Sequence, residues 1–290
     1  MVIMPVRSRI LAVHREGPRY ALLVLLLIAL LPMASESHWA SGARNSPIPE
    51  IAERGGAVQN SSPIPVGTVL PVSLENAISL KETRAGEVIQ AKITQDVPLP
   101  NRGKIPMKSP VKGSIVSILK DTDGTGVNVT LKFNQIEFGK HFFAMATSLR
   151  AIASLRAVRN AQMPFTGADS GTPTGWADTV LIGGDIRFGD SGKVRNRAKI
   201  NVGKGVPGGV LVHVNANPSL GCEGPVNGDD HPQALWVFSA DACGVYDMDV
   251  AQITHSGKSA PIGEITLHFN KDDAKLESGT GMLLRVVSQP

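Results

Sequence analysis

The sequence predicts an all-β protein made of two packed β-sandwich or β-barrel modules, and three observations support this class. Glycine (30 residues) and proline (20 residues) interrupt the 290-residue chain too often for long helices. Apolar and polar residues alternate in several short segments, most clearly from Val127 to Phe133, where every odd-numbered residue is apolar. Aromatic residues make up only 4% of the chain, so we expect a core of Val, Ile, Leu and Ala.

The N-terminus has the features of a secretory signal peptide. Four arginines precede the apolar run from Ala21 to Leu31: Arg7, Arg9, Arg15 and Arg19. This run has about 11 residues, whereas a membrane-spanning helix needs roughly 20. We therefore expect residues 1–34 to be a signal peptide, cleaved between positions 34 and 40. The protein would be exported to a periplasm, an outer envelope or the medium, and only an uncleaved signal would hold it at a membrane.

The charge of the chain does not indicate a nucleic-acid partner. The formal net charge is +4, but residues 1–40 hold four arginines against Glu16 and Glu36. Cleavage of the signal would therefore leave a mature chain of about +2, too small an excess for a nucleic-acid-binding surface of the usual kind.

The rest of the chain divides by composition and strand pattern. Residues 35–63 are rich in Ser, Gly, Pro and Ala and are expected to form a disordered tether. Residues 64–158 form the first predicted β module, residues 159–175 a linker rich in turn formers, and residues 176–288 the second module. The last strand, from Met282 to Val287, could pair with either module.

Two details of the first module are open to test. After Phe133 the apolar positions shift from odd to even numbers, at Ile136 and Phe138, and such a shift predicts a bulge or bend in the strand. Residues 151–158 suit either a strand or a short helix, because their periodicity does not distinguish the two. The second module is expected to contain strands at 180–188 and 194–202, among others.

Part of the first module resembles a known family. Residues 64–118 contain Pro65-Val66-Gly67-Thr68, Leu74-Glu75-Asn76-Ala77-Ile78, Thr94-Gln95-Asp96-Val97 and Ile105-Pro106, in this order. The segment resembles the start of the C-terminal β-barrel domain of TrbI-like conjugal-transfer channel proteins. That resemblance implies a β-rich envelope fold. The chain has Met107-Lys108-Ser109 where the family has Lys-Gly-Ser, and it lacks the long apolar pore-forming insertion. More loosely, the mature chain resembles exported proteins of environmental bacteria.

The only two cysteines, Cys222 and Cys243, flank a turn-rich loop and a short apolar run. An exported chain meets oxidising conditions, and two cysteines permit one pairing. Closing a loop of this length would stabilise the fold by about 3 kcal/mol in the chain-entropy model. We therefore expect a disulfide clasp between Cys222 and Cys243, with Trp236 as a core residue behind it.

Two motifs raise the alternative of an enzyme. Ser219-Leu220-Gly221-Cys222 is similar to the Ser-His-Gly-Cys motif of L,D-transpeptidases, which act on cell wall, but Leu220 replaces the histidine. Gly189-Asp190-Ser191-Gly192 resembles the nucleophile motif of trypsin-like proteases, but the family's histidine motif is absent and Lys193 replaces the next glycine. Asp-Ser-Gly between strands is typical of a hairpin turn, which we expect here.

A third motif raises the alternative of a carbohydrate- or Ca²⁺-binding module. Asp229, Asp230 and His231 bring carboxylates and an imidazole together, the groups that bind Ca²⁺ or Zn²⁺. They stand between Asn-Gly and Pro, and no complete ligand set is visible, so a turn is the expected reading. No metal and no cofactor are expected.

The strongest candidate binding surface is a row of cations. If residues 193–199 form an extended strand, four side chains lie on one face, about 6–7 Å apart: Lys193, Arg195, Arg197 and Lys199. Such a row suits a polyanion such as an anionic envelope polymer. The alternative is an edge strand that cations protect from aggregation.

These observations favour an exported, non-enzymatic protein with a structural or interaction role. The expected partner is an anionic envelope polymer or another envelope protein. The transpeptidase that uses Cys222 and the carbohydrate- or Ca²⁺-binding module are the alternatives.

Overall fold

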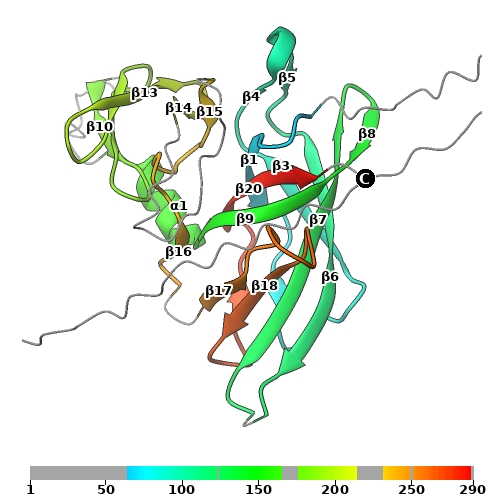
Figure 1. The fold of residues 1–290 in the computed structure, drawn as a ribbon. Coiled ribbons are helices and arrows are strands. Elements are labelled where there is room, and N and C mark those ends of the chain that lie inside the picture. Colours follow the sequence, from blue (N-terminus) through cyan, green and yellow to red (C-terminus); the bar gives the residue numbers. More distant parts are fainter. Residues whose placement is uncertain (1–63, 123, 165–175, 214–230, 249–250, 289–290) are drawn as a thin grey trace, which may run out of the picture. The chain divides into compact units, whose positions relative to one another are not determined.

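The computed structural model describes residues 64–122, 124–164, 176–213, 231–248 and 251–288 (Figure 1). They belong to one compact unit, residues 58–290. The described residues form strands, a short helix α1 (Leu155–Gln162) and a 3-10 turn η1 (Pro100–Arg102), so the predicted all-β class is confirmed. No helix among them is long and apolar enough to cross a membrane. The predicted signal peptide and tether lie outside the described residues.

The larger sheet has ten strands within the described residues, and nine of them form a continuous path. Neighbouring strands are antiparallel, except for the parallel pair at the start of the path. The order is β16 (Gly244–Tyr246), β9 (Ala146–Ala153), β20 (Gly281–Ser288), β1 (Val69–Leu74), β3 (Val88–Ile93), β6 (Pro110–Lys120), β7 (Val127–Phe138), β18 (Ile265–Phe269) and β17 (Ala251–His255). The tenth strand, β8 (His141–Ala144), forms a hairpin with β7.

The smaller sheet follows chain order, each strand antiparallel to the next. Its strands are β10 (Asp178–Val180), β11 (Ile186–Phe188), β12 (Lys193–Arg195), β13 (Asn201–Val206), β14 (Gly209–Val212) and β15 (Gln233–Ala234). Two further pairs are short ribbons: β2 (Ile78–Ser79) with β19 (Lys275–Leu276), and β4 (Val97–Pro98) with β5 (Lys104–Ile105).

The sheets do not follow the predicted division into residues 64–158 and 176–288. Strands β16, β17, β18 and β20 come after residue 243, yet they belong to the sheet of the first module. In β18 the apolar residues Ile265, Leu267 and Phe269 lie opposite Leu131, Val129 and Val127 of β7, so both strands bury the same face. A strand pairs where its apolar face can be buried together with that of its neighbour, and the partner can therefore be distant in sequence.

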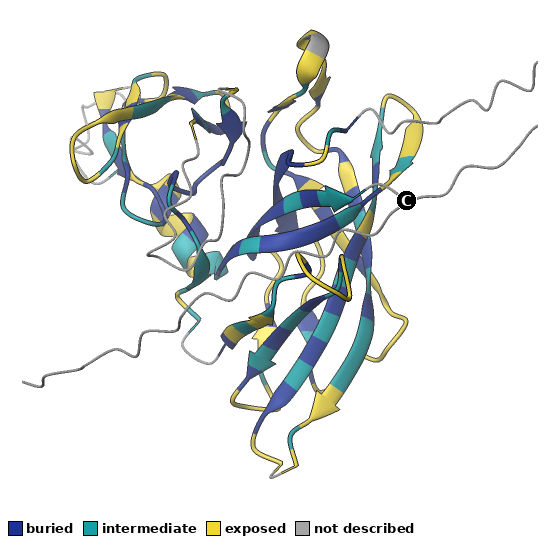
Figure 2. Ribbon diagram, in the orientation of Figure 1, coloured by how far each residue is buried: buried dark blue, intermediate teal, exposed yellow. Residues whose placement is uncertain are grey.

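Strand β1 shows why the alternation rule is incomplete for central strands. Leu70, Val72 and Leu74 enter the larger core. Simple alternation would leave the opposite face in contact with solvent, but every residue of β1 is buried (Figure 2). Val69 packs into a second apolar cluster with Trp236 and Phe238, and its N–H donates to Gln233 Oε1 (3.4 Å). A later segment of the chain therefore covers the second face.

The predicted irregularity after Phe133 is confirmed as a bulge at Asn134. Lys112 pairs with Gln135 and Gly113 pairs with Phe133, so Asn134 has no residue opposite it on β6. The extra residue reverses the side of the sheet to which later side chains point. Phe133 and Ile136 are therefore both fully buried.

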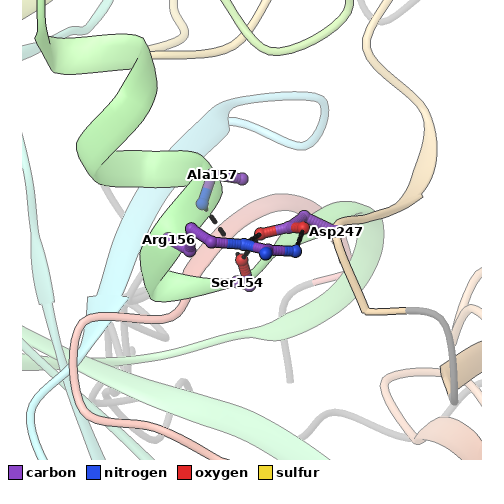
Figure 3. Close-up of polar contacts among 4 residues, drawn as sticks. All are labelled: Ser154, Arg156, Ala157 and Asp247. Carbon is purple, nitrogen blue, oxygen red and sulfur yellow. Dashed lines mark hydrogen bonds and ion pairs between the residues drawn. The ribbon is translucent and has the colours of Figure 1, made fainter.

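Helix α1 begins directly after β9, which resolves the choice between strand and helix for residues 151–158. The chain is extended to Ala153 and helical from Leu155. Ser154 is the N-cap: its Oγ accepts from the N–H of Ala157 (3.0 Å) and donates to Asp247 Oδ2 (Figure 3). The Arg156 guanidinium donates to both oxygens of Asp247. Hydrogen bonds from Arg156 and then Ser154 lower the pKa of Asp247 to about 2, so this carboxylate stays ionised and connects the end of β16 to the helix.

Candidate functional site

The predicted row of cations lies partly on a strand and partly on a turn. Strand β12 ends at Arg195, and the chain then turns, with Lys199 N–H donating to Asn196 O (2.8 Å) and Ile200 N–H donating to Asn196 Oδ1 (2.9 Å). Lys193 and Arg195 share one exposed strand face, whereas Arg197 and Lys199 lie on the turn. The expectation that all four share a strand face was therefore wrong, because the Asn196 side chain and a left-handed Lys199 (φ 62°) favour a turn.

The alternative of a protected edge strand is also wrong. Strand β12 pairs with β11 on one side and with β13 on the other. Its cations therefore do not shield an open sheet edge. Some other reason is needed for exposed cations on an interior strand.

The hairpin of β12 and β13 adds a cation that sequence reasoning missed. Lys204 of β13 lies directly opposite Lys193, and both side chains are exposed. Like charges directly opposite each other destabilise a sheet. We call Lys193, Arg195, Arg197, Lys199 and Lys204 the basic hairpin. Lys204 could be found only through the strand pairing, because it does not continue the spacing of the other four.

The cations of the basic hairpin form no ion pairs with the rest of the described protein, although Arg197 lies near the carboxylates of Asp185 and Asp241. Among the described residues, no carboxylate forms an ion pair with any of the five cations. Elsewhere in the molecule exposed lysines do pair, as Lys104 does with Asp96 and Lys120 with Asp272. The Arg195 guanidinium stacks over the ring of Phe188, 5.2 Å from its centroid, which fixes its position on the surface.

A cavity of about 410 Å³ lies at the end of this hairpin, and we call it the Asp185 pocket. Its walls come from three segments that are distant in sequence: the turn between β10 and β11, the turn after β12, and the chain that leads into β16. The lining residues are Gly183, Asp185, Asn196, Arg197, Ala198, Asp241, Cys243 and Tyr246. The pocket thus brings together one residue of the predicted basic row, Arg197, and one of the predicted clasp, Cys243.

Two glycines shape the first wall of the pocket. The predicted strand 180–188 is divided by a turn in which Gly183 (φ 105°) and Gly184 (φ 102°) adopt conformations that other residues rarely accept. A Cβ on Gly184 would lie 2.7 Å from Arg197 Nε, and one on Gly183 would lie 2.8 Å from Ser239 Cβ. The absence of side chains here lets Arg197 and Ser239 approach the turn.

Asp185 is the most buried charged group of the pocket, with 3% of its surface exposed. Its Oδ2 accepts a hydrogen bond from Ala240 N–H (2.9 Å), and its own N–H donates to Ser239 Oγ (2.8 Å). Burial raises the pKa of Asp185, and the Asp241 carboxylate raises it further, whereas the hydrogen bond from Ala240 and the charge of Arg197 oppose this. An acidic group thus remains in a position that disfavours its charge.

Arg150 of β9 supports the wall that carries Ala240 and Asp241. Its Nε donates to Ala242 O and its Nη2 donates to Ala240 O, both at 2.9 Å. Burial lowers the pKa of Arg150 to about 10, an effect that Asp241 opposes. The guanidinium therefore stays charged at neutral pH and acts as a fixed brace for this loop.

A second cavity, of about 420 Å³, is lined by the end of α1 and by residues that include Arg187, Gly209 and Trp236. Trp236 is 7% exposed, which agrees with the predicted core position, and its backbone is left-handed (φ 56°). Its N–H donates to the buried side chain of Gln95, whose Oε1 lies 2.5 Å away. A Cβ on Gly209 would lie 2.1 Å from that oxygen, so the close approach requires glycine.

The other predicted site residues are only partly visible. Cys222, Asp229 and Asp230 lie outside the described residues, so the clasp and the candidate metal ligands are not tested. His231 is exposed, and the described residues contain no group of three His, Cys, Asp or Glu side chains that could hold a metal ion. Cys243 lines the Asp185 pocket, and its N–H donates to Tyr246 Oη (3.0 Å).

The segment from Gly189 to Gly192 forms the turn between β11 and β12, which confirms the expected hairpin. A Cβ on Gly192 would lie 1.6 Å from Phe188 O, so the last glycine of this motif is required by the turn itself. The glycine therefore has a structural explanation without a nucleophile.

The described residues define an all-β protein with a basic hairpin that lacks ion pairs and a pocket that contains Asp185 beside it. No family model, no curated protein and no solved structure matches the chain. The resemblance of residues 64–118 to TrbI-like proteins therefore stays a prediction, and function must be argued from the site.

Proposed function

We propose that this chain is an exported, non-enzymatic interaction protein of the cell envelope, and that the basic hairpin binds an anionic envelope polymer. The observation that carries the proposal is the set of five exposed cations without ion-pair partners among the described residues. Lys193 and Lys204 lie opposite each other although their charges repel. A bound polyanion would neutralise both and release its own counterions, which is favourable at low salt.

Geometry supports a polymer over a single small anion. Lys193 and Arg195 are two residues apart on β12, about 6–7 Å, and Lys204 adds a cation on the neighbouring strand. Three cations on one sheet face can contact successive anionic groups of an extended chain. The turn then adds Arg197 and Lys199 beyond the strand end.

The test is a pair of matched double variants on a heparin column. Replacing Lys193 and Lys204 with alanine should shift elution to lower salt and reduce the slope of log K against log salt by about 1.4, at roughly 0.7 per lost contact with a single-stranded polyanion. Replacing Lys104 and Lys120 with alanine removes the same charge from cations that already have carboxylate partners. Equal shifts for both double variants would show that only net charge matters and would refute a specific surface.

Export and the clasp between Cys222 and Cys243 are part of the same proposal, supported by the arginine-rich N-terminus and by the short apolar run after it. We expect protein recovered from the periplasm or medium to begin between residues 35 and 41 and to show no free thiol when denatured without reductant. Thiol titration and N-terminal sequencing measure this. Two free thiols in an uncleaved chain would contradict both parts, and a free thiol only at Cys222 would favour the transpeptidase alternative.

A further inference from the structure

We propose that the Asp185 pocket binds a hydroxyl-bearing sugar unit, so that the polyanion held by the basic hairpin is an acidic polysaccharide. The inference rests on the proposed function and names the class of its ligand. It is carried by a largely buried carboxylate whose second oxygen is open to the cavity, by a cavity of fitting size, and by the position of that cavity at the end of the cation row.

The Asp185 carboxylate is only half used by the protein. Ala240 N–H donates to Oδ2, while Oδ1 accepts no hydrogen bond from any described residue. Only 3% of the surface of Asp185 is exposed, and the residue lines the cavity. Oδ1 is not among the fully buried side-chain atoms that lack a partner in the described part of the chain. It is therefore reached from the cavity, where it can accept a hydrogen bond from a donor group of a ligand.

The charges around the pocket select that donor. Asp185 and Asp241 both line the cavity and together repel an anionic group, whereas Arg197 is the lining cation. A phosphate or carboxylate of the ligand would therefore remain outside, on the basic hairpin. A neutral hydroxyl can donate to Asp185 and accept from Arg197, Asn196 or Tyr246, which are the donors of the lining.

The position of the pocket beside the basic hairpin lets one ligand place a hydroxyl group in the pocket and an anionic group on the cations. Asn196, Arg197 and Ala198 line the cavity, while Arg195 and Lys199 are their immediate neighbours in sequence and are exposed. A ligand that fills the pocket and also contacts these cations must carry hydroxyl groups and acidic groups close together. Neighbouring residues of an extended chain are only about 3.3 Å apart. Acidic polysaccharides carry both acidic groups and hydroxyl-bearing rings along one chain, whereas inorganic polyphosphate has no hydroxyl-bearing ring. The volume of about 410 Å³ lies within the usual range for ligand sites.

The effect of Asp185 on the stability of the fold also supports a binding role for this residue. The pKa of Asp185 is raised in the folded protein, so its contribution to stability is present at acidic pH and is lost as the pH rises through the folded pKa. An isosteric asparagine can still accept from Ala240 N–H without this loss. A residue that disfavours the fold at neutral pH and faces a cavity is typical of a binding site.

The experiment compares Asp185→Asn with Asp190→Asn, an exposed aspartate on the nearby β11–β12 turn. Isothermal titration calorimetry uses an oligogalacturonate and a polyphosphate with the same number of charges. The wild-type protein should prefer the oligogalacturonate, and Asp185→Asn should weaken oligogalacturonate binding at least tenfold while polyphosphate binding is unchanged. Asp190→Asn should change neither affinity by more than about twofold, since surface substitutions have small effects. The melting temperature of Asp185→Asn should equal or exceed that of the wild type at pH 7.

The outcomes separate this inference from the proposed function. Equal binding of oligogalacturonate and polyphosphate by the wild type, or unchanged oligogalacturonate binding by Asp185→Asn, would overturn the sugar site and leave the basic hairpin as a polyanion surface. Failure of the wild type to bind heparin, oligogalacturonate and polyphosphate would refute the proposed function and this inference together.

Discussion

Replacing Gln95 with leucine is expected to destabilise the protein by about 3–5 kcal/mol, a loss that few single substitutions reach. The side chain has no exposed surface and makes three hydrogen bonds. Nε2 donates to Val210 O (3.0 Å), and Oε1 accepts from the N–H groups of Val210 (3.2 Å) and Trp236 (2.5 Å). Leucine has a similar size, so the main effect is that the buried N–H groups of Val210 and Trp236 lose their partner, at about 1–3 kcal/mol each when unpaired. Val210 O keeps the hydrogen bond from Leu235 N–H (3.1 Å).

Urea denaturation measures this loss, and Gln90→Leu is the matched control. Gln90 lies on the exposed face of β3, so its replacement should change the free energy of unfolding by no more than about 0.5 kcal/mol. A similar small change for Gln95→Leu would mean that the smaller sheet does not depend on this contact. Because Gln95 follows β3 whereas Val210 and Trp236 belong to the smaller sheet and its continuation, the loss should be accompanied by faster amide exchange in β14.

Replacing Arg150 with methionine is expected to cost about 2–4 kcal/mol, because the carbonyls of Ala240 and Ala242 lose the donors that Nε and Nη2 supply. Methionine keeps most of the packing of the long side chain. Arg150→Lys should recover only part of the loss, since a lysine ammonium cannot reproduce the fixed geometry of two guanidinium donors.

A control variant and a binding measurement identify the cause of the stability loss expected for Arg150→Met. Arg159→Met removes an exposed arginine from α1 and should change stability by about 0.5 kcal/mol or less. Arg150→Met should also weaken oligogalacturonate binding, because the loop it braces supplies Asp241 and the N–H of Ala240 that holds Asp185. A destabilised variant with unchanged affinity would show that the loop keeps its position without Arg150.

Several features of the fold were predictable because they depend on neighbouring residues. Alternation of apolar side chains identified β7, and the change of phase after Phe133 predicted the irregularity that the structure shows as a bulge at Asn134. Turn-forming residues identified the hairpin at Gly189 to Gly192. These signals work because side-chain direction along a strand and the conformational freedom of glycine are local properties.

The candidate site was predictable only in part. The cations at 193–199 were visible as a group, but their division between strand and turn depends on Asn196, whose side chain accepts from Ile200 N–H. Lys204 joins them only through pairing with Lys193, and Asp185 meets Asp241 and Arg197 only after three separate segments fold together. No periodicity marks such residues in the chain.

The amino-acid order alone was enough for the all-β class, the positions of the clearest strands and the presence of unusual cations, because each follows from short-range patterns. The choice of strand partners, the burial of both faces of β1 and the existence of the Asp185 pocket came from contacts between distant segments. Those contacts depend on which surfaces exclude water most completely when packed together, and this is a property of the whole folded chain.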